Sequence, residues 1–179
     1  DDAGWDTLEL PCHWVLDRRG GTGPAGERVP AGAPGKYGRP SYTNVQYPFP
    51  VDPPHVPDEN PTGDHRRRFE VAPEWLESGR VLLRFDGVES FLQVWVNGWR
   101  VGEASGSRLA HEFDVTEAIT AGENLVAVRV VQWSAGSYLE DQDQWWLPGI
   151  FRGVTLLHRP RAGLDDVWLR ASYADGRGT

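Results

Sequence analysis

Apolar and polar residues alternate with a period of two in much of the chain after residue 66, which is the pattern of half-buried β-strands. Residues 91–102 show it most clearly, because Leu92, Val94 and Val96 share one face and Asn97-Gly98 suits the positive φ angles of a two-residue hairpin turn. The other predicted elements are a short helical turn at 73–79 and strands at 66–71, 81–86, 111–115, 124–133 and 150–158. The pattern therefore predicts an all-β fold, either a sandwich or a jelly roll.

The first third of the chain has a different composition. Residues 18–40 are so rich in Gly, Pro and Ala that we expect a long, flexible surface loop. Prolines exclude a helix from residues 41–65, which must be extended or turning. This segment also carries Tyr42, Tyr47 and Phe49, so we expect it to pack against a sheet rather than to act as a linker.

A domain boundary is predicted at Pro160, where the apolar pattern ends. Residues 1–160 would form one domain, and residues 161–179 would begin a second domain with a strand at 165–173. A chain of 179 residues is long enough for one sizeable core and the edge of a second domain. Near the start, residues 5–14 show a short strand-like alternation.

Composition and charge exclude several classes of function. The net charge of −8 and a pI near 5.1 argue against non-specific nucleic-acid binding, which depends on Lys and Arg contacts to phosphates. A single cysteine, Cys12, excludes an internal disulfide framework and favours a reducing, cytoplasmic setting. No apolar run is long enough to span a membrane, and no nucleotide-binding, phosphate-binding or common hydrolase motif is present. The chain begins without Met or a visible signal peptide, so we expect a fragment of a longer protein.

The densest group of candidate functional residues is an acidic and aromatic segment. Glu140, Asp141 and Asp143 precede Trp145 and Trp146, which places acceptors for hydroxyls or a hard cation beside rings on which a sugar could stack. If the segment is extended, Asp141 and Asp143 project to the same side. An acidic surface loop with two core tryptophans would have the same spacing. From the residues alone, a carbohydrate-binding sandwich ranks ahead of a protein-interaction module and of a self-sufficient glycoside hydrolase that uses a carboxylate pair.

Several motifs together carry a resemblance to a known family. They are SYTNVQYP at 41–48, ENPTG at 59–63, GSYLEDQDQWW at 136–146 and GIFR at 149–152. With them, the chain resembles the N-terminal region of bacterial β-galactosidases of glycoside hydrolase family 2, from about residue 8 to residue 173 outside the loop at 18–40. The resemblance implies a jelly-roll β-sandwich of the galactose-binding type, followed by an immunoglobulin-like domain and a catalytic TIM barrel. The strand at 165–173 would then be the first of the immunoglobulin-like domain.

The resemblance also assigns roles to three residues. Asn44 of the YTNV motif would hydrogen-bond the substrate, and Val45 would line the pocket. Asp143, the second Asp of the EDQD motif, would contact galactose hydroxyl groups and ligate a sodium ion whose other protein ligands come from the barrel. Without the family match, Asn44 reads as a turn residue and Asp143 as an exposed loop acid. Both catalytic glutamates of the family lie in the barrel, so we expect no catalytic residue here and no hydrolysis by this chain alone.

For the full-length protein, the resemblance implies retaining hydrolysis of terminal β-D-galactosides such as lactose, with magnesium as a further cofactor and a homo-oligomeric assembly. Ala135 and Ser105 stand where some members have an acidic residue and a Gln, so the chain departs from the family pattern for magnesium there. The alternatives are a lectin-like module that binds sugar by itself, a purely structural domain, and specificity for β-glucuronides or β-mannosides. The expected partners are the galactoside and the rest of the same chain, without nucleic acid or membrane.

Overall fold

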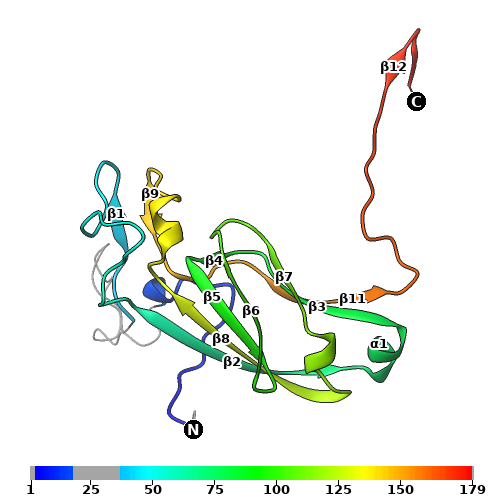
Figure 1. Cartoon of the computed structure of the whole chain (residues 1–179), viewed down its shortest axis with the longest axis horizontal. Helices are drawn as coiled ribbons and strands as arrows, with labels where there is room; N and C mark the ends of the chain where they lie inside the picture. Colours follow the sequence, from blue (N-terminus) through cyan, green and yellow to red (C-terminus); the bar gives the residue numbers. More distant parts are fainter. Residues whose placement is uncertain (1–2, 18–36, 179) are drawn as a thin grey trace, which may run out of the picture.

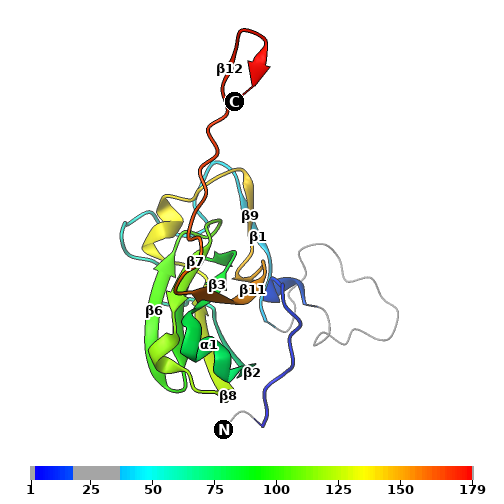
Figure 2. The same ribbon diagram turned by 90° about the vertical axis from the view of Figure 1, so that its right-hand side faces the viewer.

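Two antiparallel sheets pack face to face and enclose the main core (Figures 1 and 2). One sheet has the order β2-β8-β5-β6 and is formed by β2 (Thr62–Val71), β5 (Phe91–Val96), β6 (Trp99–Ser105) and β8 (Gly122–Val131). The other has the order β11-β3-β7 and is formed by β3 (Gly79–Phe85), β7 (His111–Asp114) and β11 (Val154–Pro160). This computed structural model describes residues 3–17 and 37–178. The predicted flexible loop at 18–40 therefore lies, for residues 18–36, outside the described residues.

The core between the sheets follows from the alternation of side chains. Buried apolar residues from both sheets fill it: Val81, Leu83, Phe85, Leu92, Val94, Val96, Val128 and Val130. Removing one such side chain from water stabilises the fold by about 1.5–3 kcal/mol. The hairpin between β5 and β6 turns at Asn97 and Gly98, whose φ angles of 51° and 86° are those that the Asn-Gly pair favours. The predicted all-β jelly-roll sandwich is confirmed, as is this hairpin.

Three smaller pairs of strands lie outside the two sheets. They are β1 (Ser41–Thr43) with β9 (Gln144–Trp146), β4 (Val88–Glu89) with β10 (Gly149–Ile150), and β12 (Tyr173–Ala174) with β13 (Arg177–Gly178). In residues 3–17 and 37–178, the helices are α1 (Pro73–Ser78) and three 3₁₀ helices at Trp14–Leu16, Thr116–Ala118 and Ala135–Tyr138. Figure 1 shows β1 and β9 side by side at one end of the sandwich, opposite the end that carries α1. Within the described residues, no helix is long and apolar enough to cross a membrane.

Three predicted strands need correction. The segment 150–158 is divided, because Ile150 pairs with β4 while the residues from Val154 pair with β3. Residues 5–14 form no strand; the backbone N–H of Cys12 donates one hydrogen bond to the carbonyl of Ile150 instead. Both cases show that an alternating pattern becomes a strand only where a partner strand supplies hydrogen bonds.

The predicted strand at 165–173 is also not formed. Residues 163–172 have no strand assignment, and only Tyr173–Ala174 pairs, with Arg177–Gly178 in a short hairpin. Figure 1 shows this segment leaving the sandwich as an extended tail. Its apolar side chains face solvent, with Trp168 81% exposed. The assignment of residues 161–179 to a second, immunoglobulin-like domain stays a prediction.

Candidate functional site

The ribbon formed by β1 and β9, called the β1–β9 ribbon below, joins two segments about a hundred residues apart. Thr43 pairs with Gln144, so Asn44 and Asp143 are the next residues at the end of the ribbon. Tyr42 and Trp145 are directly paired and share a face, and both Asp143 and the side chain of Asn44 interact with the hydroxyl of Tyr42 on that face. The predicted residues Asn44 and Asp143 are therefore brought to the same edge of the molecule.

The exposed face of the ribbon combines a carboxylate with two aromatic rings. Tyr42 pairs directly with Trp145, and their ring centroids are 5.4 Å apart at an interplanar angle of 39°. Each of the two side chains is 47% exposed. The hydroxyl of Tyr42 donates a hydrogen bond of 2.5 Å to Oδ1 of Asp143. Asp143 and Asn44 are also exposed, and Val45 beside them is 85% exposed.

The opposite face of the ribbon is buried in a second, aromatic core. Trp146 is 6% exposed and packs edge-on against Trp133 at 5.4 Å, and Trp133 packs against Phe49 at 5.1 Å. The indole N–H of Trp146 donates to Oγ1 of Thr43 at 3.2 Å. The two adjacent tryptophans therefore lie on opposite faces of the ribbon: Trp146 is a core residue and Trp145 is available to a ligand.

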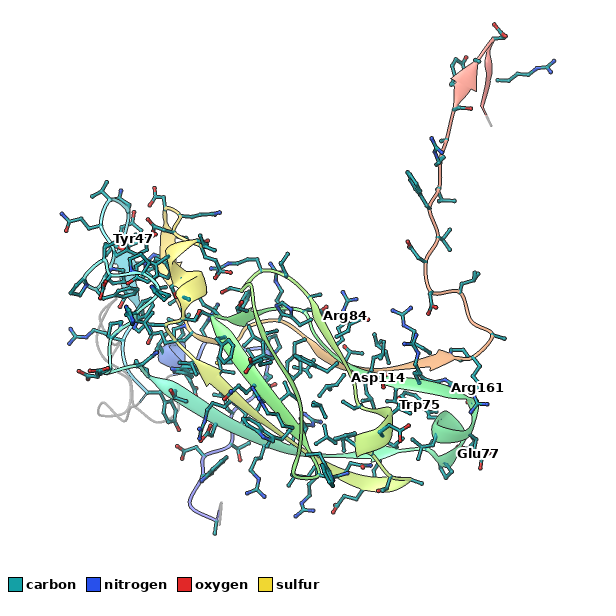
Figure 3. All side chains as sticks on the ribbon, in the orientation of Figure 1. Tyr47, Trp75, Glu77, Arg84, Asp114 and Arg161 are labelled. Carbon is teal, nitrogen blue, oxygen red and sulfur yellow. The ribbon has the colours of Figure 1, made fainter. Side chains whose placement is uncertain are left out.

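The proline-rich segment 41–65 was predicted to pack against a sheet, and its aromatic residues Tyr47 and Phe49 pack in this aromatic core. Tyr47 contacts Trp146 and Tyr138, and its hydroxyl donates to the carbonyl of Tyr138 at 2.7 Å. Asn60 holds Trp133 by two hydrogen bonds of 2.8 and 2.9 Å to its backbone. Figure 3 shows Tyr47 at the end of the molecule that carries β1 and β9, far from Trp75 at the α1 end. Such packing gives the exposed face of the ribbon a rigid base.

The three acidic residues of the EDQD segment have different roles. Oε1 and Oε2 of Glu140 accept hydrogen bonds from the backbone N–H and the hydroxyl of buried Ser107, at 2.7 and 2.5 Å. Glu140 therefore ties its loop to the end of β6 and is engaged in the fold. Asp141 and Asp143 are exposed, but the extended strand begins only at Gln144, so the predicted alternation does not include them. Asp143 accepts the hydrogen bond from Tyr42 of the aromatic pair.

A buried carboxylate beside the end of β9 was not predicted from the sequence. Glu89 is 3% exposed, and its Oε1 accepts a hydrogen bond of 3.1 Å from the backbone N–H of Leu147. Its Oε2 lies 3.0 Å from the guanidinium of Arg108 but has no aligned hydrogen-bond donor among the described residues. Burial raises the pKa of Glu89 to about 7, and the charge of Arg108 opposes that rise. Glu89 thus anchors the chain directly after β9.

Electrostatics keep the phenol of Tyr42 in its donating form. The hydrogen bond to Asp143 is the main cause of a raised pKa for Tyr42, and the Asn44 side chain acts in the opposite direction. A protonated phenol can donate to Asp143 across the neutral pH range. No strand was predicted at residues 41–43. With a strand there, the alternation of side chains would have placed Tyr42 on the same side of the chain as Asn44.

The ribbon can supply only part of a metal site. In residues 3–17 and 37–178, no group of three or more His, Cys, Asp or Glu side chains is arranged to hold a metal ion. Asp143 and Asn44 offer oxygen atoms, which hard cations prefer, but such ions take about six ligands. A cation held here would need most of its ligands from outside these residues.

Comparisons with known proteins agree with the motifs. The model of the glycosyl hydrolases family 2 sugar binding domain matches residues 24–160. The chain belongs to this family. The resemblance expected from the sequence is thus confirmed, and the family assignment makes the exposed aromatic and carboxylate face of the ribbon a candidate sugar contact.

Relatives with similar sequences are much longer than this chain. The β-galactosidase of Arthrobacter sp. (strain B7) is 61% identical over 181 residues, which cover 100% of this chain and 16% of the relative. The β-galactosidase of Photobacterium profundum is 44% identical over 180 residues, covering 98% of this chain and 16% of the relative. A solved β-glucuronidase from an uncultured Clostridium sp. is 26% identical, with a TM-score of 0.56 over 68% of this chain and 23% of that chain.

Proposed function

We propose that this domain belongs to a retaining β-galactosidase and that the β1–β9 ribbon forms one wall of its substrate site. The observation that carries the proposal is the pairing of β1 with β9, which assembles Tyr42, Asn44, Asp143 and Trp145 on one exposed face. A galactoside needs an apolar surface for its C–H face and acceptors for its hydroxyl groups, and this face offers both.

Each residue of the ribbon has a distinct part in the proposed site. The amide of Asn44 would exchange hydrogen bonds with a sugar hydroxyl, and Val45, exposed beside it, would provide an apolar wall. Asp143 would accept from galactose hydroxyl groups and give one ligand to a sodium ion. The hydroxyl of Tyr42 bonds to one carboxylate oxygen, Oδ1, so Oδ2 would be the oxygen that accepts from the sugar or the ion.

The sequence relatives favour a galactoside over a glucuronide. The relatives at 61% and 44% identity are β-galactosidases, whereas the β-glucuronidase is 26% identical. Charge points the same way, because the exposed carboxylates of Asp141 and Asp143 would repel the carboxylate of a glucuronide. A neutral sugar meets no such repulsion.

The catalytic residues would lie in other domains of a longer polypeptide. The chain spans 16% of the length of either relative, which leaves room for the immunoglobulin-like domain and the TIM barrel. The barrel would carry the two glutamates and the remaining sodium ligands, and it would cover the exposed face of the ribbon. Magnesium and a homo-oligomeric assembly would belong to that longer protein as well. The domain alone would then be inactive on a chromogenic galactoside.

The test compares Asp143→Asn with Asp141→Asn in the longer polypeptide that carries this domain. Loss of charged hydrogen bonds to the sugar is worth about 1.5–3 kcal/mol, so Asp143→Asn should raise KM for a β-galactoside by about 10- to 100-fold and abolish its dependence on sodium. Asp141→Asn, which changes an exposed acid two residues away, should leave KM and the sodium dependence near those of the wild type. Equal effects of the two substitutions would contradict the proposed role of Asp143.

A further inference from the structure

A cavity lies on the outer face of the four-stranded sheet and shares no residue with the β1–β9 ribbon. Its volume is about 280 Å³, close to the lower end of the range for small-ligand pockets. Side chains at its border include Trp5, Asp64, Arg66, Trp95 and Arg129. Figure 1 shows the N-terminal segment running past β2 and away from the end of the sandwich that carries β1 and β9.

The cavity arises from the order of side chains across three strands. Ala127 of β8 pairs with Arg66 of β2 on one side and with Trp95 of β5 on the other. Neighbouring strands are about 4.8 Å apart, so the backbones of Arg66 and Trp95 are separated by about 10 Å with only a methyl group between them. Trp5 extends the wall on the β2 side, since the guanidinium of Arg66 lies 5.8 Å from the centre of its ring. Two indole rings therefore border one small depression.

The next row of side chains along the strands supplies fixed polar groups. Asp64 pairs with Arg129, and the guanidinium donates two hydrogen bonds of 2.8 and 2.9 Å to the two carboxylate oxygens. The hydrogen bonds from Arg129 lower the pKa of Asp64, so its carboxylate stays an acceptor. Both side chains remain about half exposed, at 43% and 50%. A ligand in the cavity thus meets an acceptor and a donor that are already oriented.

We propose that this cavity binds a neutral pyranose ring at a site separate from the β1–β9 ribbon. Indole faces stack on the C–H surface of a sugar, and adjacent hydroxyl groups match a carboxylate and a guanidinium held side by side. The ion pair between Asp64 and Arg129 balances their charges, so the ligand needs no charge of its own. The site goes beyond the proposed galactosidase function, because it would bind sugar without contact to the reacting bond.

The experiment follows the indole N–H signals of Trp5 and Trp95 in the ¹⁵N-labelled chain during titration with methyl β-D-galactopyranoside. Saturable shifts of both signals are expected at low millimolar sugar. Trp5→Ala should weaken binding about fivefold, and Ala127→Leu, which fills the depression, should weaken it more than about tenfold. Trp99→Ala is the matched control, since Trp99 is 73% exposed at the tip of the β5–β6 hairpin. It should leave the affinity unchanged.

Two outcomes would overturn the proposal. One is the absence of saturable shifts of Trp5 and Trp95 up to about 100 mM sugar, which would correspond to an affinity too weak for a specific sugar-binding site. The other is a set of shifts confined to Asn44 and Asp143. Asp143→Asn separates the two sites, because it should abolish binding at the ribbon and leave the shifts of Trp5 and Trp95 intact. Trp5 is not part of a strand, so we expect Trp5→Ala to change the cavity and leave the sheets folded.

Discussion

Replacement of Glu89 by Gln should remove most of the decrease in the free energy of unfolding that ionisation of Glu89 causes as the pH rises. Glu89 is buried in β4 beside Leu147, which directly follows β9, and burial raises its pKa from 4.5 to about 7. The folded chain therefore binds this proton more tightly than the unfolded chain. Its contribution to stability is fully present below pH 4.5 and is lost as the pH rises through about 7.

The magnitude follows from the two pKa values. One pKa unit corresponds to about 1.4 kcal/mol, so full ionisation of Glu89 should lower the free energy of unfolding by about 3 kcal/mol. His13 and His65 act in the opposite direction, because burial lowers their pKa values and their contribution is lost as the pH falls below 6.5. Both histidines are present in the wild type and in the variant, so the difference between the two proteins isolates Glu89.

The assay is urea unfolding of the wild type and Glu89→Gln from about pH 4.5 to about pH 8. The wild type should lose about 3 kcal/mol relative to the variant across this interval. Glu117→Gln is the control, since Glu117 is an exposed carboxylate in a 3₁₀ helix, and its difference from the wild type should stay within about 0.5 kcal/mol at every pH. A Glu89→Gln difference that does not change with pH would refute the reasoning.

Two further substitutions test the β5–β6 turn and a close approach between two backbone segments. Asn97→Ala should lower the free energy of unfolding by about 2–3 kcal/mol in a urea titration, because Asn97 has a positive φ and its side chain bonds to Asn124 and to the backbone of Leu125. Asp175→Ala is the control. Asp175 has a similar φ but lies on the exposed tail, so its substitution should lower the free energy of unfolding by less than about 1 kcal/mol. Gly149→Ala should lower Tm by several degrees or more, because a Cβ would lie 2.4 Å from the carbonyl oxygen of Cys12, and a Tm equal to that of the wild type would show that the chain moves aside without cost.

Local patterns in the sequence determined most of the sandwich. Strand β5 and the Asn97-Gly98 hairpin follow from the period of two and from residues that adopt positive φ, both of which act within a few residues. The helix at Pro73–Ser78 follows from the proline in its first turn, and the buried face of β8 follows from the alternation. The alternation was misleading at 150–158 and 165–173, where a strand depends on a partner that the local pattern does not contain.

Motifs in the sequence also identified Asn44, Val45 and Asp143 as candidate residues, but each motif is a local string. Only the tertiary structure placed Asn44 next to Asp143, through a strand pair between segments a hundred residues apart, and added Tyr42 and Trp145 to their face. It likewise decided that Glu140 serves the fold and that Glu89 is buried with a raised pKa. The physical reason is that propensity and periodicity depend on neighbours along the chain, whereas burial, ion pairing and the pKa of a carboxylate depend on neighbours in space.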